Sequence, residues 1–133
     1  MTARNMQDEA KSKGLPWSIA KGFDTFLPIS GPISAKDIPD PHDVELSLSV
    51  NDEVKQQDST GLMLFRIPRL LSQISRVMTL QEGDLVLTGT PKGVGRVNVG
   101  DTMKAVLKVR GKEVERIEVG VADKGGLFEF SET

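Results

Sequence analysis

The stretch from Asp84 to Gly95 limits the possible folds of this chain most, because an apolar run changes there into a glycine-rich turn. Leu85–Thr88 is apolar or β-branched and follows a turn signal, so we predict a strand. Three glycines in Gly89–Gly95 let the backbone approach another group closely and expose N–H donors, and Thr90 adds a hydroxyl. The loop is therefore either a tight turn that ends a strand or a grip for an oxyanion or carboxylate.

The residue types exclude several kinds of active site. The chain has no cysteine, which excludes disulfides, thiol catalysis and thiolate metal sites. Its single histidine, His42, lies in a run bracketed by Pro39 and Pro41, a poor setting for the locked imidazole of a Ser-His-Asp triad. Lys92 precedes the last two glycines of the loop, whereas the lysine of a nucleotide-binding Walker A loop directly follows the final glycine.

The charge balance and hydropathy predict no nucleic-acid and no membrane partner. The 133 residues carry a formal net charge of −2, without the basic excess that nucleic-acid binding needs. No apolar run approaches the ~20 residues of a membrane span. Residues 1–12 are polar and mixed in charge, unlike a targeting segment, and we expect either a mitochondrial or a cytoplasmic location.

The first residues predict a helix over Thr2–Lys13, with Thr2 as its N-cap and Gly14 as its stop. Arg4 and Gln7 lie three residues apart and share a polar face, which is either solvated or turned towards a ligand. A stable domain rarely begins at the second residue of a helix. We therefore expect further polypeptide before this helix to cover it.

Two residues after this helix are candidates for packing and for chemistry. Trp17, the only tryptophan, is predicted to be a packing anchor. Lys21 stands between Ala20 and Gly22, so it is either an ordinary solvated lysine or a partly buried one. A partly buried lysine has a lowered pKa, which suits carbonyl chemistry.

Alternation of apolar and polar residues predicts two antiparallel hairpins. The predicted strands are Val44–Val50, Glu53–Gln57, Thr102–Val109 and Glu113–Val121. Together with Leu85–Thr88 they give about five or six strands and two helices, without a βαβ rhythm. The predicted fold is mainly β with a few helices (α+β), in a single domain over residues 1–133.

A second helix is predicted over Pro68–Val77, with proline in its first turn. Its apolar stripe should belong to the core and consists of Ile67, Leu70, Leu71, Ile74 and Val77. We expect Phe65, Ile67 and Leu71 to be buried. Three residues of the tail are expected to dock back on the domain, namely Leu127, Phe128 and Phe130.

Three stretches resemble the fumarylacetoacetate hydrolase family. Asp84–Gly95, with its Leu-Thr-Gly-Thr-Pro-Lys-Gly-Val-Gly core, resembles the signature near the family's C-terminus. Thr2–Gln7 is similar to the helix that follows a metal-binding aspartate, and Lys13–Lys21 to the segment that ends in an active-site lysine. The resemblance covers nearly the whole chain and points to the branch acting on acylpyruvates and oxaloacetate.

The resemblance implies a site for a small 2-oxo acid, formed in a homodimeric enzyme. It implies Lys21 as the catalytic lysine beside the enolate oxygen, Arg4 and Gln7 facing the ligand, and Gly89 and Thr90 binding its carboxylate. It also implies Mg²⁺ or Mn²⁺, whose ligands would precede Met1. The fold would then be the C-terminal part of the family's mixed β-roll, incomplete at its N-terminal side.

Two functions follow from the resemblance. In the first, the chain is part of a Mg²⁺-dependent enzyme for acylpyruvate hydrolysis, oxaloacetate decarboxylation or keto–enol tautomerisation. In the second, it is a truncated product without the metal ligands, and it acts only as a folded or dimerising module. Glu113 and Glu115 do not replace the missing metal ligands, because they directly follow a hairpin turn late in the chain.

Overall fold

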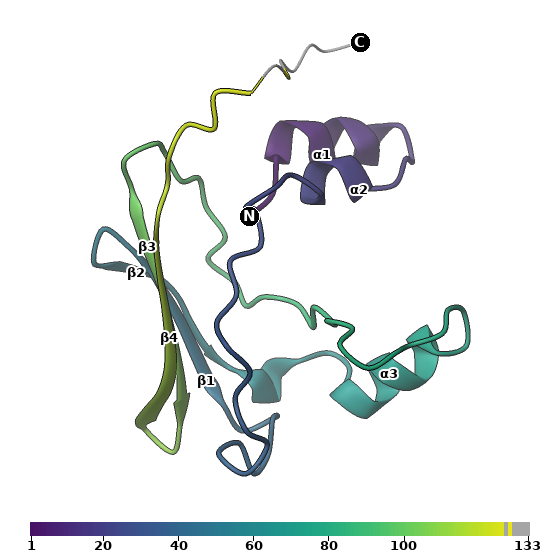
Figure 1. Cartoon of the computed structure of the whole chain (residues 1–133), viewed down its shortest axis with the longest axis vertical. Coiled ribbons are helices and arrows are strands. Elements are labelled where there is room, and N and C mark those ends of the chain that lie inside the picture. The colour runs from purple at the N-terminus through teal and green to yellow at the C-terminus, as the bar shows by residue number, and fades with distance from the viewer. Residues whose placement is uncertain (127, 129–133) are drawn as a thin grey trace.

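The computed structural model describes residues 1–126 and 128, which form an antiparallel sheet accompanied by short helices. Figure 1 shows α1 and α2 together near one end of the molecule, the sheet along one side and α3 apart from both. The helices are α1 (Arg4–Ser12), α2 (Ser18–Lys21), the 3₁₀ helix η1 (Thr60–Leu62) and α3 (Ile67–Ile74). The strands are β1 (Glu45–Val50), β2 (Glu53–Ser59), β3 (Thr102–Val109) and β4 (Lys112–Gly120).

The sheet has the order β2-β1-β3-β4, and every neighbouring pair is antiparallel. In the register, Leu46 is opposite Leu107, and Leu48 is opposite both Ala105 and Gln56. Because side chains alternate across a strand, these residues share one face of the sheet. The predicted α+β class and the two predicted hairpins are thereby confirmed.

An asparagine joins the β1–β2 turn to the loop that enters β3. Asn51 has a positive φ of 50°, and its amide donates to Asp101 Oδ1 at 2.8 Å while its carbonyl oxygen accepts from Thr102 N–H at 2.9 Å. Asp101 also accepts from the Asn98 backbone N–H at 2.7 Å. The Asn98 N–H and the Asn51 amide lower the pKa of Asp101 below its usual 3.8.

The His42 side chain bonds to the start of α3, a structural role that agrees with its exclusion from a Ser-His-Asp triad. Its Nε2 accepts the backbone N–H of Ile67 at 3.0 Å. The first N–H groups of a helix lack partners within the helix, so this contact satisfies one at the start of α3.

Several predicted elements are wrong. Leu85–Thr88 is not a strand, because no strand of the described chain pairs with it, and the sheet has four strands rather than five or six. The first helix begins at Arg4 with Ala3 as N-cap, so Thr2 does not cap it. Residues 1–126 and 128 contain three α-helices rather than two, and α3 ends at Ile74, short of Val77.

The predicted burial around α3 is also wrong. Phe65 is 60% exposed and Leu71 38% exposed, whereas Ile67 is only half-buried. In Figure 1 α3 lies apart from the sheet, so the sheet does not cover this helix. Trp17 is exposed as well, and the buried apolar residues in the described chain are Ala20, Val44 and Val50.

The C-terminal tail returns to the segment after α2. Phe128 packs edge-on against Phe23 at 5.7 Å between ring centroids, as the sequence predicts, and Lys124 pairs with Asp24 at 3.1 Å. Leu127 and Phe130 lie outside the described residues. Within the described part of the chain, no helix has the length and apolar character needed to cross a bilayer.

The Asp101 network predicts a pH-dependent stability. Because the folded-state pKa of Asp101 is lowered, its ionised form stabilises the fold above pH 3.8, and this is lost as pH falls through the folded pKa. Asp101→Asn should therefore unfold at lower urea concentration at pH 7, with a gap to the unmodified chain that closes in acid. Asp37→Asn is the control, because its carboxylate makes no hydrogen bond among the described residues. A gap that is constant with pH would contradict the assignment.

The exposed apolar surface predicts self-association or marginal stability. Leu64 is 94% exposed, and large apolar side chains along the α3 region and the glycine-rich loop are also exposed. The melting temperature should rise with protein concentration, and light scattering should detect species larger than one chain. A sharp melt at high temperature that does not change over a hundredfold range of concentration would count against this.

Candidate functional site

Lys21 is held next to the N-terminal segment. The Lys21 Nζ donates to Thr2 Oγ1 at 2.6 Å, and the Ala3 N–H donates to the Ala20 carbonyl at 3.0 Å. The Lys21 side chain is exposed, which favours a solvated lysine over a buried one. The Thr2 hydroxyl therefore accepts a hydrogen bond from Lys21 and does not cap α1.

The Met1 amino group lies close to the same lysine. It donates to the Phe26 carbonyl, and burial followed by the charge of Lys21 lowers the pKa of this amino group below 8.0. Lys21 therefore supplies a cation between α2 and the start of α1, and the neighbouring amino group adds N–H donors. Such a region favours a bound anion or a developing oxyanion.

Arg4 and Gln7 form a pair on α1. The Arg4 Nη1 donates to Gln7 Oε1 at 2.7 Å, and Gln7 is only 6% exposed. Their spacing of three residues places them on one face of the helix, as predicted. The guanidinium retains donors beyond the one used here, because arginine has five N–H groups.

The glycine-rich loop is tied to β2 by a buried glutamine that the sequence reasoning missed. The Gln56 Nε2 lies 3.0 Å from Thr90 Oγ1, 2.6 Å from the Pro91 carbonyl and 3.2 Å from the Lys92 carbonyl. Gln56 is 8% exposed and opposite Leu48 on the apolar face of the sheet. The alternation pattern does not indicate it, because a register shift at Leu48/Ser49 places Gln56 opposite Leu48, where an unbroken hairpin would place Lys55.

Gly93 explains why the loop needs glycine. Its φ is 97°, and a Cβ placed there would be 2.0 Å from the Lys55 carbonyl oxygen. The loop backbone is thus pressed against β2, as the glycine-rich sequence predicts. Gly89 also has a positive φ, of 118°, but its Cβ position is open.

A cavity of about 480 Å³ lies between the apolar face of the sheet, the chain after α2 and the glycine-rich loop. This size is typical of small-molecule sites. Gly89 and Thr90 line it together with Gln56 and Met1, whereas Lys21, Arg4 and Gln7 do not. Lys21 is linked to the cavity only indirectly, because it bonds to Thr2 and the adjacent Met1 lines the cavity. The remaining lining residues are Phe26, Leu27, Pro28, Ser30, Ile33, Leu46, Ser47, Leu48, Pro91, Ala105, Val106, Leu107, Glu115, Arg116 and Ile117.

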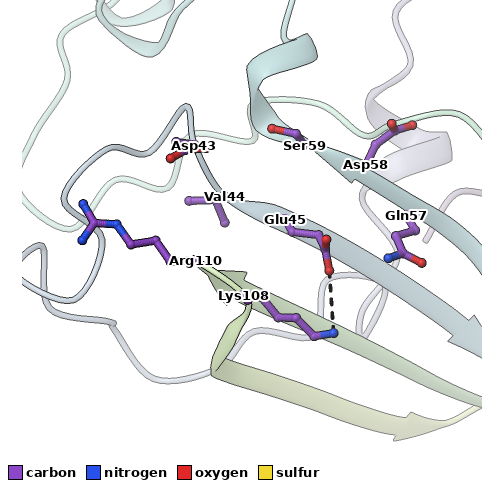
Figure 2. A pocket seen from close by; sticks show the side chains of 9 residues that line it. Asp43, Val44, Glu45, Gln57, Asp58, Ser59, Lys108 and Arg110 are labelled. Carbon is purple, nitrogen blue, oxygen red and sulfur yellow. Dashed lines mark ion pairs between the residues drawn. The ribbon is translucent and has the colours of Figure 1, made fainter.

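A second hollow, of about 550 Å³, contains none of the predicted site residues. It lies at the end of the sheet where β1 begins, and Figure 2 shows its charged side chains. Glu45 and Lys108 form an ion pair at 3.7 Å, and Arg110 and Asp58 also line the hollow. Its carboxylates and cations largely offset each other, so we assign it no chemistry.

The described residues do not fit a divalent metal ion. No group of three or more histidine and acidic side chains comes together within residues 1–126 and 128. Glu113 is bonded through both carboxylate oxygens to Arg116, at 2.9 Å each, so it is engaged in an ion pair. The Mg²⁺ or Mn²⁺ that the resemblance implies has no ligand set in this part of the chain.

Sequence comparison relates the chain to one enzyme family. Residues 1–121 match the family described as Fumarylacetoacetate (FAA) hydrolase C-terminal. The mitochondrial oxaloacetate tautomerase oaa1 of Schizosaccharomyces pombe is 64% identical over 108 residues, which cover 80% of this chain and 48% of that protein. The mitochondrial oxaloacetate tautomerase FAHD1 of Bos taurus is 50% identical over 122 residues, covering 89% and 55%. The chain thus spans about half the length of the curated relatives it matches.

Solved structures share this fold. A yeast protein of the fumarylacetoacetate hydrolase family has a TM-score of 0.93 and 40% identity, over 98% of this chain and 57% of that one. The 2-hydroxyhepta-2,4-diene-1,7-dioate isomerase of Mycobacterium marinum has a TM-score of 0.77 and 41% identity, over 90% and 45%.

The contact at Gly93 predicts a large effect of one methyl group. Gly93→Ala forces the loop away from β2 and holds alanine at a positive φ, so it should destabilise the fold by about 1–3 kcal/mol. Gly95→Ala is the matched control, because nothing lies within 4 Å of its Cβ position. Urea unfolding measures both, and equal effects of the two variants would contradict the close approach.

Proposed function

Because the chain belongs to the fumarylacetoacetate hydrolase family, we propose that it acts on small 2-oxo acids, with keto–enol tautomerisation of oxaloacetate as its reaction. The observation that carries this proposal is the 64% identity to an oxaloacetate tautomerase over 80% of the chain. Acylpyruvate hydrolysis and oxaloacetate decarboxylation pass through the same kind of enolate, so the same groups could serve them.

Lys21 is proposed to stabilise the enolate. In tautomerisation a proton leaves the carbon next to the keto group, the electron pair moves to the keto oxygen, and that oxygen then takes up a proton. A cation beside this oxygen stabilises the transition state, where the negative charge develops. A lysine ammonium has three N–H donors, and Thr2 accepts from one in the described chain.

The other proposed contacts bind and orient the substrate. Thr90 and the backbone at Gly89 line the cavity and would donate to a carboxylate oxygen. Arg4 and Gln7 would contact the substrate from α1, since arginine suits planar recognition of a carboxylate. These roles use only the amine, hydroxyl, amide and guanidinium groups of this chain.

We also propose a mitochondrial location and assembly as a homodimer. Several relatives carry the word mitochondrial in their names, which supports the first part. The exposed apolar side chains around α3 support the second, because such surfaces are typical of interfaces.

A second candidate is a folded, non-catalytic module. The absence of a metal-ligand group within the described residues favours it for the chain on its own. It predicts folding and self-association without turnover.

The decisive experiment follows oxaloacetate with the purified chain while Mg²⁺ is titrated. Spectroscopy of the enol and assay of pyruvate separate tautomerisation from decarboxylation. Lys21→Ala should lower the rate by about 10²–10³, the usual cost of removing a group that stabilises an oxyanion. Lys36→Ala is the control, because this exposed lysine lies in a loop outside the cavity. Absence of turnover at every Mg²⁺ concentration would favour the non-catalytic module.

A further inference from the structure

We propose that Gln56 is a positioning residue that fixes the glycine-rich loop and sets the direction in which the Thr90 hydroxyl donates. The proposal rests on the proposed function only in one respect, namely that Thr90 binds the carboxylate of the substrate. Gln56 itself touches the loop and is not required to touch the reacting atoms.

The loop depends on this side chain for its attachment. Residues 85–97 make no backbone–backbone hydrogen bond in the described chain. Their hydrogen bonds to the rest of that chain come from Gln56, which lies within 3.2 Å of three oxygens, one on each of Thr90, Pro91 and Lys92. A loop of this length without a ladder would otherwise sample many conformations.

The orientation of the Gln56 amide is fixed by chemistry. Two of its three partners are backbone carbonyls, which can only accept, so the nitrogen rather than the oxygen must face the loop. The NH₂ group has two hydrogens for three acceptor oxygens, so one hydrogen is shared between two of these oxygens.

This orientation determines what Thr90 can do. Because the Thr90 oxygen accepts from Gln56, its own hydrogen is directed to a different partner. Thr90 lines the cavity, so the hydroxyl is left to donate to a group bound there. A carboxylate has only acceptor oxygens and requires such a donor. Gln56 thus leaves the Thr90 hydrogen available for donation towards the cavity.

Loop rigidity tests the first part of the proposal without any ligand. Gln56→Met keeps the length of the side chain and removes the donor. Backbone order parameters from ¹⁵N relaxation at Gly89, Gly93 and Gly95 should fall from about 0.85 to below about 0.6, with β4 unchanged. Gln57→Met is the matched control, because Gln57 lies on the opposite face of β2. Unchanged order parameters in Gln56→Met would overturn the proposal.

The pH dependence of binding tests the second part, with oxalate as the probe in the presence and absence of Mg²⁺. In Gln56→Glu the ionised carboxylate accepts from Thr90 and reverses the hydroxyl, so oxalate should bind about tenfold more weakly at pH 7.5. Burial among carbonyls raises the pKa of such a glutamate, so binding should recover as pH falls towards about 5. The unmodified chain and Gln57→Glu should show no such recovery.

The outcomes separate this proposal from the proposed function. If Thr90→Val weakens oxalate binding while Gln56→Glu follows the pH profile of the unmodified chain, the role of Gln56 is wrong and the carboxylate site stands. If the unmodified chain binds no oxalate, the proposed function fails and so does the donor role of Thr90. The order parameters then decide whether Gln56 anchors the loop.

Discussion

The arrangement of this site depends on one buried amide. Gln56 projects from β2 onto the apolar face of the sheet, where burying an unpaired amide would cost about 1–3 kcal/mol. The loop from Gly89 to Lys92 satisfies it, and the amide in turn supplies the hydrogen bonds that the loop lacks within itself. Sheet and loop therefore stabilise each other, and the register of β2 against β1 decides where Thr90 lies.

The strands were predictable because their signals are local. Alternating side chains and the turn residues around Asn51 and Gly111 specify both hairpins without reference to distant parts of the chain. Leu85–Thr88 has the same local character, yet it forms no strand, since a strand exists only with a partner. The predicted burial of the apolar stripe on α3 was wrong for a related reason. Amphipathicity shows that a helix face can be buried but not which element covers it.

The site could be predicted only in part from the sequence. The resemblance indicated Lys21, Arg4, Gln7 and the glycine-rich loop. In the structure the three side chains lie on α1 and α2, whereas the loop is bonded to β2. Gln56 was missed because its partners lie more than thirty residues further along the sequence. Only the folded chain brings Gln56 Nε2 to 3.0 Å from Thr90 Oγ1. Its inward position also depends on the register shift at Leu48/Ser49, which the alternation of side chains does not reveal.

The proposed catalytic lysine and the carboxylate-binding loop are held by different parts of the fold, and this limits how the chain could perform catalysis. Lys21 is carried by the helical layer, whereas Thr90 is carried by the sheet through Gln56. Ala3 bonds to Ala20 within the helical part of the chain, and the Met1 amino group bonds to Phe26 at the edge of the cavity. An enzyme that moves protons must hold its groups within about 0.5 Å of the productive geometry. Neither the bond from Lys21 to Thr2 nor the bond from Gln56 to Thr90 fixes the distance between the cation and the carboxylate grip, so the packing of the helical part against the sheet bears on activity as directly as the chemical groups themselves.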